Sequence, residues 1–314
     1  MNTTTIDIAA ALTSTAALTP AEAVRAIEDA LQSGFDPTTD LQRQILDVKY
    51  GQLLVMPSQL QSGVGVKVAT VAPANANRGL PRIQAVYALF DALTLSPRAV
   101  FDGTALTTLR TPAVSIAAVK PALLAKNSPL HITVFGAGPQ GTGHVATIAE
   151  VVDGHREIAS VTYVVRRPTE AGVPPGNTVV KAHSPRAALA VYRADVIVCA
   201  TGDGEPLFDS TGTKSDVIVI AVGSHDPDRR EVDTQLVSRA QVIVEDRATA
   251  LREAGDVVMA IAESDLTADD LIPMKDVVTG TRLLETDLAV FFKSSGMSWQ
   301  DLVVAEAIAT RLNN

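Results

Sequence analysis

Apolar residues change their spacing along this chain, and each change predicts a different kind of element. Residues 20–32 place Ala23, Ile27 and Leu31 on one side of a helix. From residue 41 to 104 the apolar runs become short and are separated by Gly, Pro and Asn, which predicts strands. These runs are LLVMP, VGVKVATVAP and PRAVFDG, and IQAVYALFDAL between them reads mostly as a strand, with a helix as the alternative.

A long helix is expected over residues 104–125, with Pro112 and Pro121 as bends or breaks. Further on, strands and helices alternate, which predicts a parallel sheet covered by helices on both faces. The expected strands are 131–135, 160–165, 178–181, 195–200, 217–222 and 241–245. Because we take the sheet to be complete there, an amphipathic helix over 298–312, with Ser298 as its N-cap, should return to the first part of the chain.

Composition agrees with an α/β protein and narrows the class of partner. The chain is 46% hydrophobic but only 4% aromatic, so its core is built from small aliphatic side chains. A net charge of −9 argues against binding nucleic acid or a membrane surface. No apolar run reaches the length of a membrane span, and the N-terminus lacks the pattern of a secretory signal. We therefore expect a soluble, cytoplasmic protein.

Metal chemistry and disulfides are not indicated by the sequence. The one cysteine, Cys199, lies in the apolar run VIVCAT and is expected in the core. The five histidines and this cysteine show no metal-ligand spacing, so no metal site is expected.

The most specific local motif is HITVFGAGPQGTG at residues 131–143, which joins an apolar strand to a helical pattern. Its glycines have the G-x-G-x-x-G spacing of a dinucleotide-binding turn, with the strand and helix that such a turn requires. The first glycine permits the tight turn, the second lets the backbone approach a pyrophosphate, and the third lets the helix pack on the strand. The expected contacts are Gly136, Ala137, Gly138, Pro139, Gln140 and Gly141.

The end of the next strand indicates which nicotinamide cofactor is bound. Strand VTYVV runs into Arg166 and Arg167, where an acidic residue would favour NAD and an arginine suits the 2′-phosphate of NADP. We therefore favour NADP(H), with NAD(H) as the alternative; two solvated loop arginines without a role in binding are the other interpretation. The cofactor-binding set that we expect also includes Thr111, Thr201, Val222 and Gly223.

Several phrases, in order over nearly the whole chain, resemble the ornithine cyclodeaminase/mu-crystallin family. They include LLVMPS, GVKVATVAPAN, FDGTALTTLRTPAVSIAA, FGAGPQGTGH, AVGSHDPDRREVD and FFKSSGMSWQDLVVA. The resemblance implies a Rossmann-type doubly wound domain at residues 123–296. It also implies a discontinuous α+β substrate-binding and dimerisation domain at 1–122 and 297–314, and a homodimer. Members of the family transfer hydride between a nicotinamide and a carbon that bears nitrogen.

The resemblance also implies which residues meet a small imino or amino acid. Arg43 and Arg110 match the arginines that bind the substrate carboxylate, with Arg43 placed only by its offset before MPS. Lys67, inside the apolar run VGVKVATV, matches the lysine near the reacting carbon and would handle a proton. Surface salt bridges, or a lysine that reaches out to solvent, are the alternatives.

Two departures from the family pattern bear on the substrate. Cyclodeaminases carry an aspartate where this chain has His225, and a threonine where it has Arg82. Loss of the aspartate removes a partner for a cationic amino group, and Arg82 would disfavour an ornithine side chain further if it points inward. We therefore expect an NAD(P)H-dependent reductase of a small cyclic imino acid such as Δ1-pyrroline-2-carboxylate. His225 could donate a proton or be a plain loop residue. Ornithine cyclodeamination with bound NAD, or a cofactor-binding protein without significant catalysis, are the other hypotheses.

Overall fold

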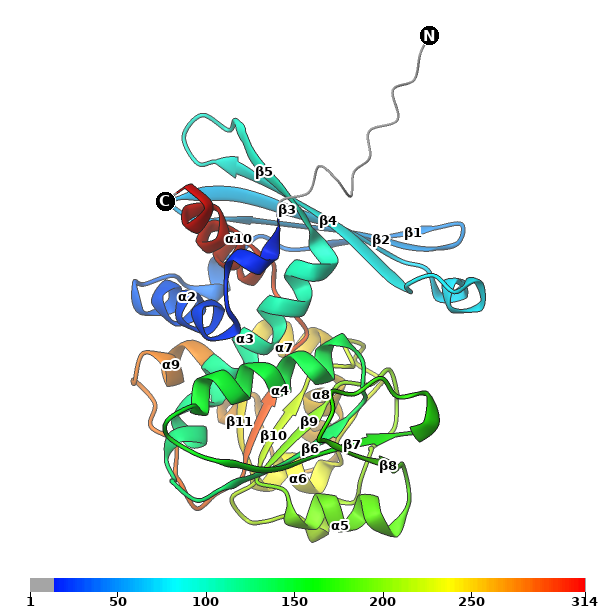
Figure 1. The fold of residues 1–314 in the computed structure, drawn as a ribbon. Coiled ribbons are helices and arrows are strands. Elements are labelled where there is room, and N and C mark those ends of the chain that lie inside the picture. The colour runs from blue at the N-terminus through cyan, green and yellow to red at the C-terminus, as the bar shows by residue number, and fades with distance from the viewer. Residues whose placement is uncertain (1–13, 314) are drawn as a thin grey trace. The chain divides into compact units, whose positions relative to one another are not determined.

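A computed structural model describes residues 14–313 of the chain. The described part divides into two compact units (Figure 1). The first comprises the residues up to Arg110 and those from Met297 on, and the second is Thr111–Gly296. The division rests on compactness, and the expected roles of the two parts in binding substrate and dinucleotide stay predictions.

An antiparallel sheet forms the centre of the first unit, and its strands follow one another in chain order. The strands are β1 (Gln44–Val48), β2 (Gly51–Gln59), β3 (Gly63–Val71), β4 (Ile83–Asp91) and β5 (Pro97–Asp102). Two helices, α2 (Pro20–Gln32) and α10 (Ser298–Asn313), pack against each other, and α10 also packs against β2 and β3. Short 3-10 turns lie at Thr15–Ala17, Pro37–Thr39 and Pro73–Arg78.

The two faces of this sheet differ in burial because side chains alternate along each strand. On the inner face Met56, Lys67, Tyr87 and Phe101 lie opposite one another across four strands, and all are buried. On the outer face, apolar side chains such as Val68, which is 40% exposed, remain open to solvent. The strand pattern therefore buries one cation, Lys67, among the apolar groups of the inner face.

The second unit is a parallel sheet in the order β12-β11-β13-β10-β9-β6-β7-β8. Its strands are β6 (Leu130–Phe135), β7 (Ile158–Val165), β8 (Thr178–Lys181), β9 (Val196–Cys199), β10 (Ile218–Ala221), β11 (Gln241–Val244), β12 (Ile272–Pro273) and β13 (Val290–Lys293). The chain starts at β6 and adds β7 and then β8 on one side of it, and then returns to place β9 on the other side of β6. This reversal is the switch point of a doubly wound fold, so the predicted α/β class is confirmed.

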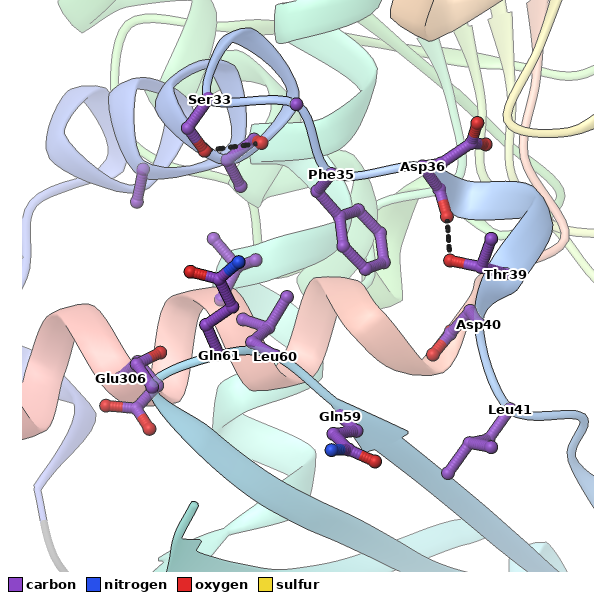
Figure 2. A pocket seen from close by; sticks show the side chains of 15 residues that line it. Ser33, Phe35, Asp36, Thr39, Asp40, Leu41, Gln59, Leu60, Gln61 and Glu306 are labelled. Atoms are coloured by element: carbon purple, nitrogen blue, oxygen red, sulfur yellow. Dashed lines mark hydrogen bonds between the residues drawn. The ribbon is translucent and has the colours of Figure 1, made fainter. Parts of the chain in front are cut away.

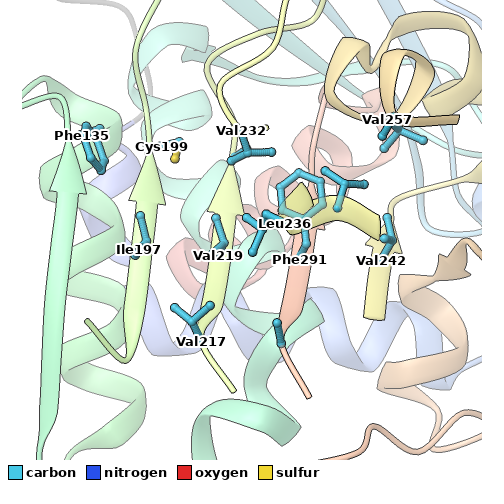
Figure 3. Packing of buried hydrophobic residues seen from close by; sticks show 14 of the residues in the cluster. Phe135, Ile197, Cys199, Val217, Val219, Val232, Leu236, Val242, Val257 and Phe291 are labelled. Carbon is cyan, nitrogen blue, oxygen red and sulfur yellow. The ribbon is translucent and has the colours of Figure 1, made fainter. Parts of the chain in front are cut away.

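Helices cover this sheet and close its core. They are α4 (Pro139–Val152), α5 (Pro185–Arg193), α6 (Thr234–Arg239), α7 (Arg247–Glu253), α8 (Gly255–Glu263) and α9 (Met274–Val278), with 3-10 turns at Pro168–Glu170, Ser210–Gly212 and Ala268–Asp270. Figure 3 shows one layer of the core, where Ile197, Val219 and Phe291 on the strands face Leu236 of α6 and Val257 of α8. Helix α3 (Gly103–Leu124) runs from the first unit into the second.

Local periodicity predicted most elements, and its errors have physical causes. The helix over 20–32, the strand over Ile83–Asp91 and the buried position of Cys199 are confirmed. The sheet was not complete at residue 245, because β13 inserts between β10 and β11. Pro112 and Pro121 do not break α3, which continues through both. Helix α10 is buried around most of its circumference instead of being amphipathic.

Within residues 14–313, none of the helices has the length and apolar character that crossing a membrane requires. Over the same residues, no group of three or more His, Cys, Asp or Glu side chains is placed to hold a metal ion.

Candidate functional site

The glycine turn of the second unit combines close backbone packing with one open position. Gly136 has φ +100°, and a Cβ there would lie 2.5 Å from the carbonyl oxygen of Ala200. A Cβ on Gly141 would lie 2.2 Å from the carbonyl oxygen of Gly136. Gly138 is the N-cap of α4, and a Cβ there would meet nothing within 4 Å. The turn therefore packs tightly at two glycines and faces open space at the third, where the amide groups of the helix start.

A cavity of about 510 Å³ lies beside this turn. Its walls come from the carboxyl ends of three parallel strands, β6, β7 and β9, together with the segment after β8. They include Gly136, Ala137, Arg166, Arg167, Ala182, His183 and Thr201 to Leu207. In open α/β sheets this edge, next to the switch point, is where ligands bind.

Arg166 and Arg167 stand at this cavity with most of their side chains in solvent, 82% and 77% exposed. Arg166 Nη1 lies 3.6 Å from Asp203 Oδ1, and Arg167 Nη1 lies 2.9 Å from Glu170 Oε2. Exposed ion pairs of this kind are weak. A phosphate group could therefore take either guanidinium from its carboxylate partner.

The buried carboxylate of Glu231 forms hydrogen bonds to both loops that follow β9 and β10. Its carboxylate accepts hydrogen bonds from the Thr201 amide (2.9 Å), the Thr201 hydroxyl (3.0 Å) and the Gly223 amide (2.6 Å). Burial raises the pKa of Glu231, while the charge of Lys293 lowers it. The amides of Thr201 and Gly223 thus bond within the protein, as does the Val222 amide, which donates to the Cys199 carbonyl.

A second buried pair, which the sequence analysis did not identify, supports the same loops. Lys293 Nζ lies 2.7 Å from Asp256 Oδ2 and donates to the Ser224 carbonyl at 2.7 Å. Asp256 Oδ1 accepts from the amides of Glu231 and Val232. The only sequence signal was a lysine at the end of the apolar run VFFK. His225 follows the anchored Ser224 and is itself exposed.

Lys67 and Arg110 of the first unit share one buried carboxylate, that of Asp301. Lys67 Nζ lies 2.7 Å from Asp301 Oδ2 and 3.3 Å from the Thr107 hydroxyl. Arg110 Nε lies 3.3 Å from Asp301 Oδ1, and Arg110 Nη1 donates to Gln300 Oε1 at 2.8 Å. Lys67 is 4% exposed, Arg110 5% and Asp301 0%. Strand β3, helix α3 and helix α10 thus meet at this ion triad.

Burial and the neighbouring charges together bring the pKa of Lys67 into the range of acid–base chemistry. Burial, which disfavours the ammonium ion, is the largest effect and lowers the pKa of Lys67 to about 8. Asp301 opposes this shift, whereas the positive charges of Arg110 and of half-buried Arg43 add to it. The structure therefore brings Arg43 and Arg110 within electrostatic range of Lys67.

Asp40 anchors the start of α10, the helix that carries Asp301. Its carboxylate accepts from the Ser58 hydroxyl (2.7 Å) and from the amide of Trp299 (2.8 Å). Burial raises the pKa of Asp40. A cavity of about 850 Å³ is lined by Asp40 together with Phe35, Gln59, Leu60 and Glu306. Figure 2 shows these side chains around it. Lys67 and Arg110 do not line this cavity.

Two further polar side chains of the first unit make structural contacts. Asp102 caps α3 by accepting from the amides of Thr104 and Ala105. Asn75 Nδ2 donates to the Pro81 carbonyl. Arg82, whose presence counted against a cationic substrate if it pointed inward, is exposed.

Comparison with known proteins places this arrangement in a family. Residues 4–314 match the model of the ornithine cyclodeaminase/mu-crystallin family. The chain belongs to this family, and the resemblance inferred from its motifs is confirmed.

Its relatives include two reductases. The chain is 30% identical over 302 residues to a Δ1-pyrroline-2-carboxylate reductase of Colwellia psychrerythraea, across 90% of this chain and 92% of that protein. It is 32% identical over 263 residues to the ketimine reductase mu-crystallin of Mus musculus, across 82% and 80%. The fold matches that of Thermococcus litoralis Δ1-pyrroline-2-carboxylate reductase in complex with NADH and L-proline, with a TM-score of 0.82, 24% identity and 94% of each chain covered.

His144 leads to a prediction about stability and pH. Its Nδ1 donates to the Gln140 carbonyl in the glycine turn, its Nε2 lies 2.9 Å from the Ser115 hydroxyl, and burial lowers its pKa from 6.5 to about 4. His144 is therefore protonated below about pH 6.5 in the unfolded chain, but only below about pH 4 in the folded chain. Stability from this group is complete above pH 6.5 and is lost as the pH falls towards 4, by about 1.4 kcal/mol per pH unit.

Urea unfolding of the wild type and of His144→Asn between pH 4 and 7 measures this effect. The variant should be less stable at pH 7, and its free energy of unfolding should fall less steeply as the pH is lowered. Equal slopes for the two proteins would contradict the assignment.

Proposed function

We propose that this protein is an NAD(P)H-dependent reductase of a small cyclic 2-imino acid, of the Δ1-pyrroline-2-carboxylate type. The reductase relatives support the reaction class. The observation that carries the proposal is the buried triad of Lys67, Arg110 and Asp301, because it places a titratable amine beside a guanidinium. These are the two groups that reduction of a carboxylate-bearing imine requires: one to hold the carboxylate and one to supply a proton.

The glycine turn and its cavity fit a nicotinamide dinucleotide. The open side of Gly138 at the start of α4 suits a pyrophosphate, and the cavity that follows it is bounded by two arginines. When bound, the dihydronicotinamide supplies the hydride that reduces the imine carbon. The second unit holds the cofactor in this proposal, while the first unit holds the substrate.

Arg110, with Arg43, binds the substrate carboxylate, since a guanidinium offers parallel N–H groups to two carboxylate oxygens. Lys67 in its ammonium form donates a proton to the imine nitrogen, which makes the adjacent carbon a better hydride acceptor. The nitrogen keeps this proton in the cyclic amino acid product, and Lys67 then regains a proton from solvent. A lysine with a pKa near 8 can complete both transfers near neutral pH.

Lys67→Met tests the proton transfer. Wild-type protein should oxidise NADPH when Δ1-pyrroline-2-carboxylate is added, and the rate should fall as the pH rises through about 8, because the ammonium form is lost. The variant should lose at least about 100-fold in kcat, the usual contribution of a positioned acid. Its affinity for NADPH, followed by nucleotide fluorescence, should stay within about twofold.

Two outcomes would overturn this function. Wild-type turnover of ornithine to proline with catalytic NAD, without imine reduction, would identify a cyclodeaminase. Tight NADPH binding with neither activity would identify a cofactor-binding protein.

We further propose that the cofactor is NADP(H), because Arg166 and Arg167 stand at the end of β7 in weak, exposed ion pairs. The double variant Arg166→Ala/Arg167→Ala should raise the KM for NADPH about tenfold or more and leave that for NADH within about twofold. Arg282→Ala, an exposed arginine of the same unit outside the cavity, is the control. A similar rise for both cofactors would remove the preference.

We also propose a homodimer formed through the outer face of the five-stranded sheet. Val68 of β3, its neighbour Val86 of β4 and Val100 of β5 are 40%, 37% and 39% exposed there. Apolar surface of this kind is stabilised by burial against a second copy.

Val68→Asp should convert the dimer to monomer in sedimentation velocity at micromolar concentration, because it places a charge in an apolar interface. Leu189→Asp, at a residue 47% exposed on α5, should leave the dimer intact. A wild-type protein that sediments as a monomer would refute the proposal.

A further inference from the structure

Asp301 contacts both Lys67 and Arg110, but the proposed proton transfer and carboxylate binding give it no role of its own. It comes from the C-terminal helix α10, far along the chain from Lys67 and Arg110, and its side chain is fully buried. A buried carboxylate is unfavourable unless charged partners compensate it. Here each of its two oxygens faces a different cation, Lys67 on β3 and Arg110 on α3.

We propose that Asp301 is a positioning residue of the reaction: it orients Arg110 towards the substrate carboxylate and keeps Lys67 in the ammonium form needed for proton donation. This role rests on the proposed imine reductase function.

The hydrogen bonds of Arg110 show how the orientation works. Asp301 takes the Nε hydrogen and Gln300 takes one Nη1 hydrogen. A guanidinium has five N–H donors in a planar fork, so one Nη1 hydrogen and both Nη2 hydrogens are not used by Asp301 and Gln300. These donors can bind a carboxylate, and Asp301 and Gln300, at adjacent positions of one helix, fix the plane of the fork.

The position of Asp301 is fixed because other residues hold the start of α10 in place. Asp40 accepts from the amide of Trp299, two residues before Asp301, and Trp299 packs on the ring of Phe35 at 5.3 Å between centroids. Trp299 and Asp301 are both fully buried. Asp40 and Phe35 thus hold the start of α10, and with it the carboxylate of Asp301, beside both cations.

The charges that face Lys67 come from each element around it. Arg110 on α3 and Arg43 before β1 are positive, and Asp301 on α10 is negative. Thr107 on α3 is a neutral hydrogen-bond partner. Tyr87, opposite Lys67 on β4, stays neutral because burial and then the charge of Asp301 raise its pKa. Asp301 therefore offsets part of the repulsion between Lys67 and two arginines.

Removal of this charge should be visible in the pH profile. Asp301→Asn keeps the shape of the side chain but leaves Lys67 with positive neighbours, so Lys67 should lose its proton at lower pH. We expect the alkaline limb of kcat/KM for Δ1-pyrroline-2-carboxylate to move from about pH 8 to lower pH by about one unit or more. The KM for the imino acid should rise about tenfold as the Arg110 fork loses its direction.

Two variants separate positioning from general stability. Asp301→Glu, which restores the charge, should return the alkaline limb towards its wild-type position. Glu306→Gln removes a carboxylate of the same helix that pairs with Arg98 at 2.8 Å, and should leave the pH profile and KM unchanged. NADPH affinity should stay within about twofold in all three.

A readout without turnover keeps this inference distinct from the proposed function. Carbon-13 NMR of labelled lysine side chains, with Lys67 assigned from the Lys67→Met spectrum, reports its titration directly. A titration midpoint near 8 that falls in Asp301→Asn supports the charge role even if the wild type reduces no imine. An unchanged midpoint, or an unchanged alkaline limb in an active Asp301→Asn enzyme, would overturn it, as would the same shift in Glu306→Gln.

Discussion

The arrangement of the first unit depends on the buried carboxylate of Asp301, which has no contact with solvent. Two cations, Lys67 at 2.7 Å and Arg110 at 3.3 Å, compensate it, and each comes from a different element. Removing one member of such a buried group leaves an uncompensated charge and costs about 3–5 kcal/mol. The last helix of the chain is therefore held against the sheet and α3 of the first unit by electrostatics as well as by apolar packing.

The second unit also contains buried charged side chains, at the carboxyl edge of its parallel sheet. Glu231 binds the amides of Thr201 and Gly223, and the Asp256–Lys293 pair binds the backbone on both sides of the loop that carries His225. Backbone hydrogen bonds within these loops, such as that of the Arg230 amide to the Gly204 carbonyl, add to the contacts of the buried charges. In both units, buried charges position the groups that carry the proposed chemistry, while apolar side chains fill the core.

Sequence reasoning succeeded where the signal is local. The 3.6-residue spacing of α2 and the glycine turn before α4 need only neighbouring residues to be recognised. Lys67 drew attention because a lysine in an apolar strand must find a polar partner. Asp301 drew no attention, because an aspartate near the start of a helix is typical of a cap. Its burial depends on Lys67 and Arg110, which lie 234 and 191 positions before it in the chain. Strand β13 was missed because its place in the sheet is decided by pairing with β10 and β11.

The sequence by itself determined the α/β class, the glycine turn between a strand and a helix, and the family. The turn and the alternation of strands and helices are local patterns, because steric and hydrogen-bonding rules act between neighbouring residues. The family shows in motifs along nearly the whole chain, and that resemblance also suggested Lys67 and Arg110 as substrate-site residues. Only the tertiary structure decided that Asp301 is shared by both cations, that β13 completes the sheet and that Glu231 occupies the amides of Thr201 and Gly223. These are long-range pairings, chosen because a buried charge or polar group must find its partner wherever the fold brings one within reach.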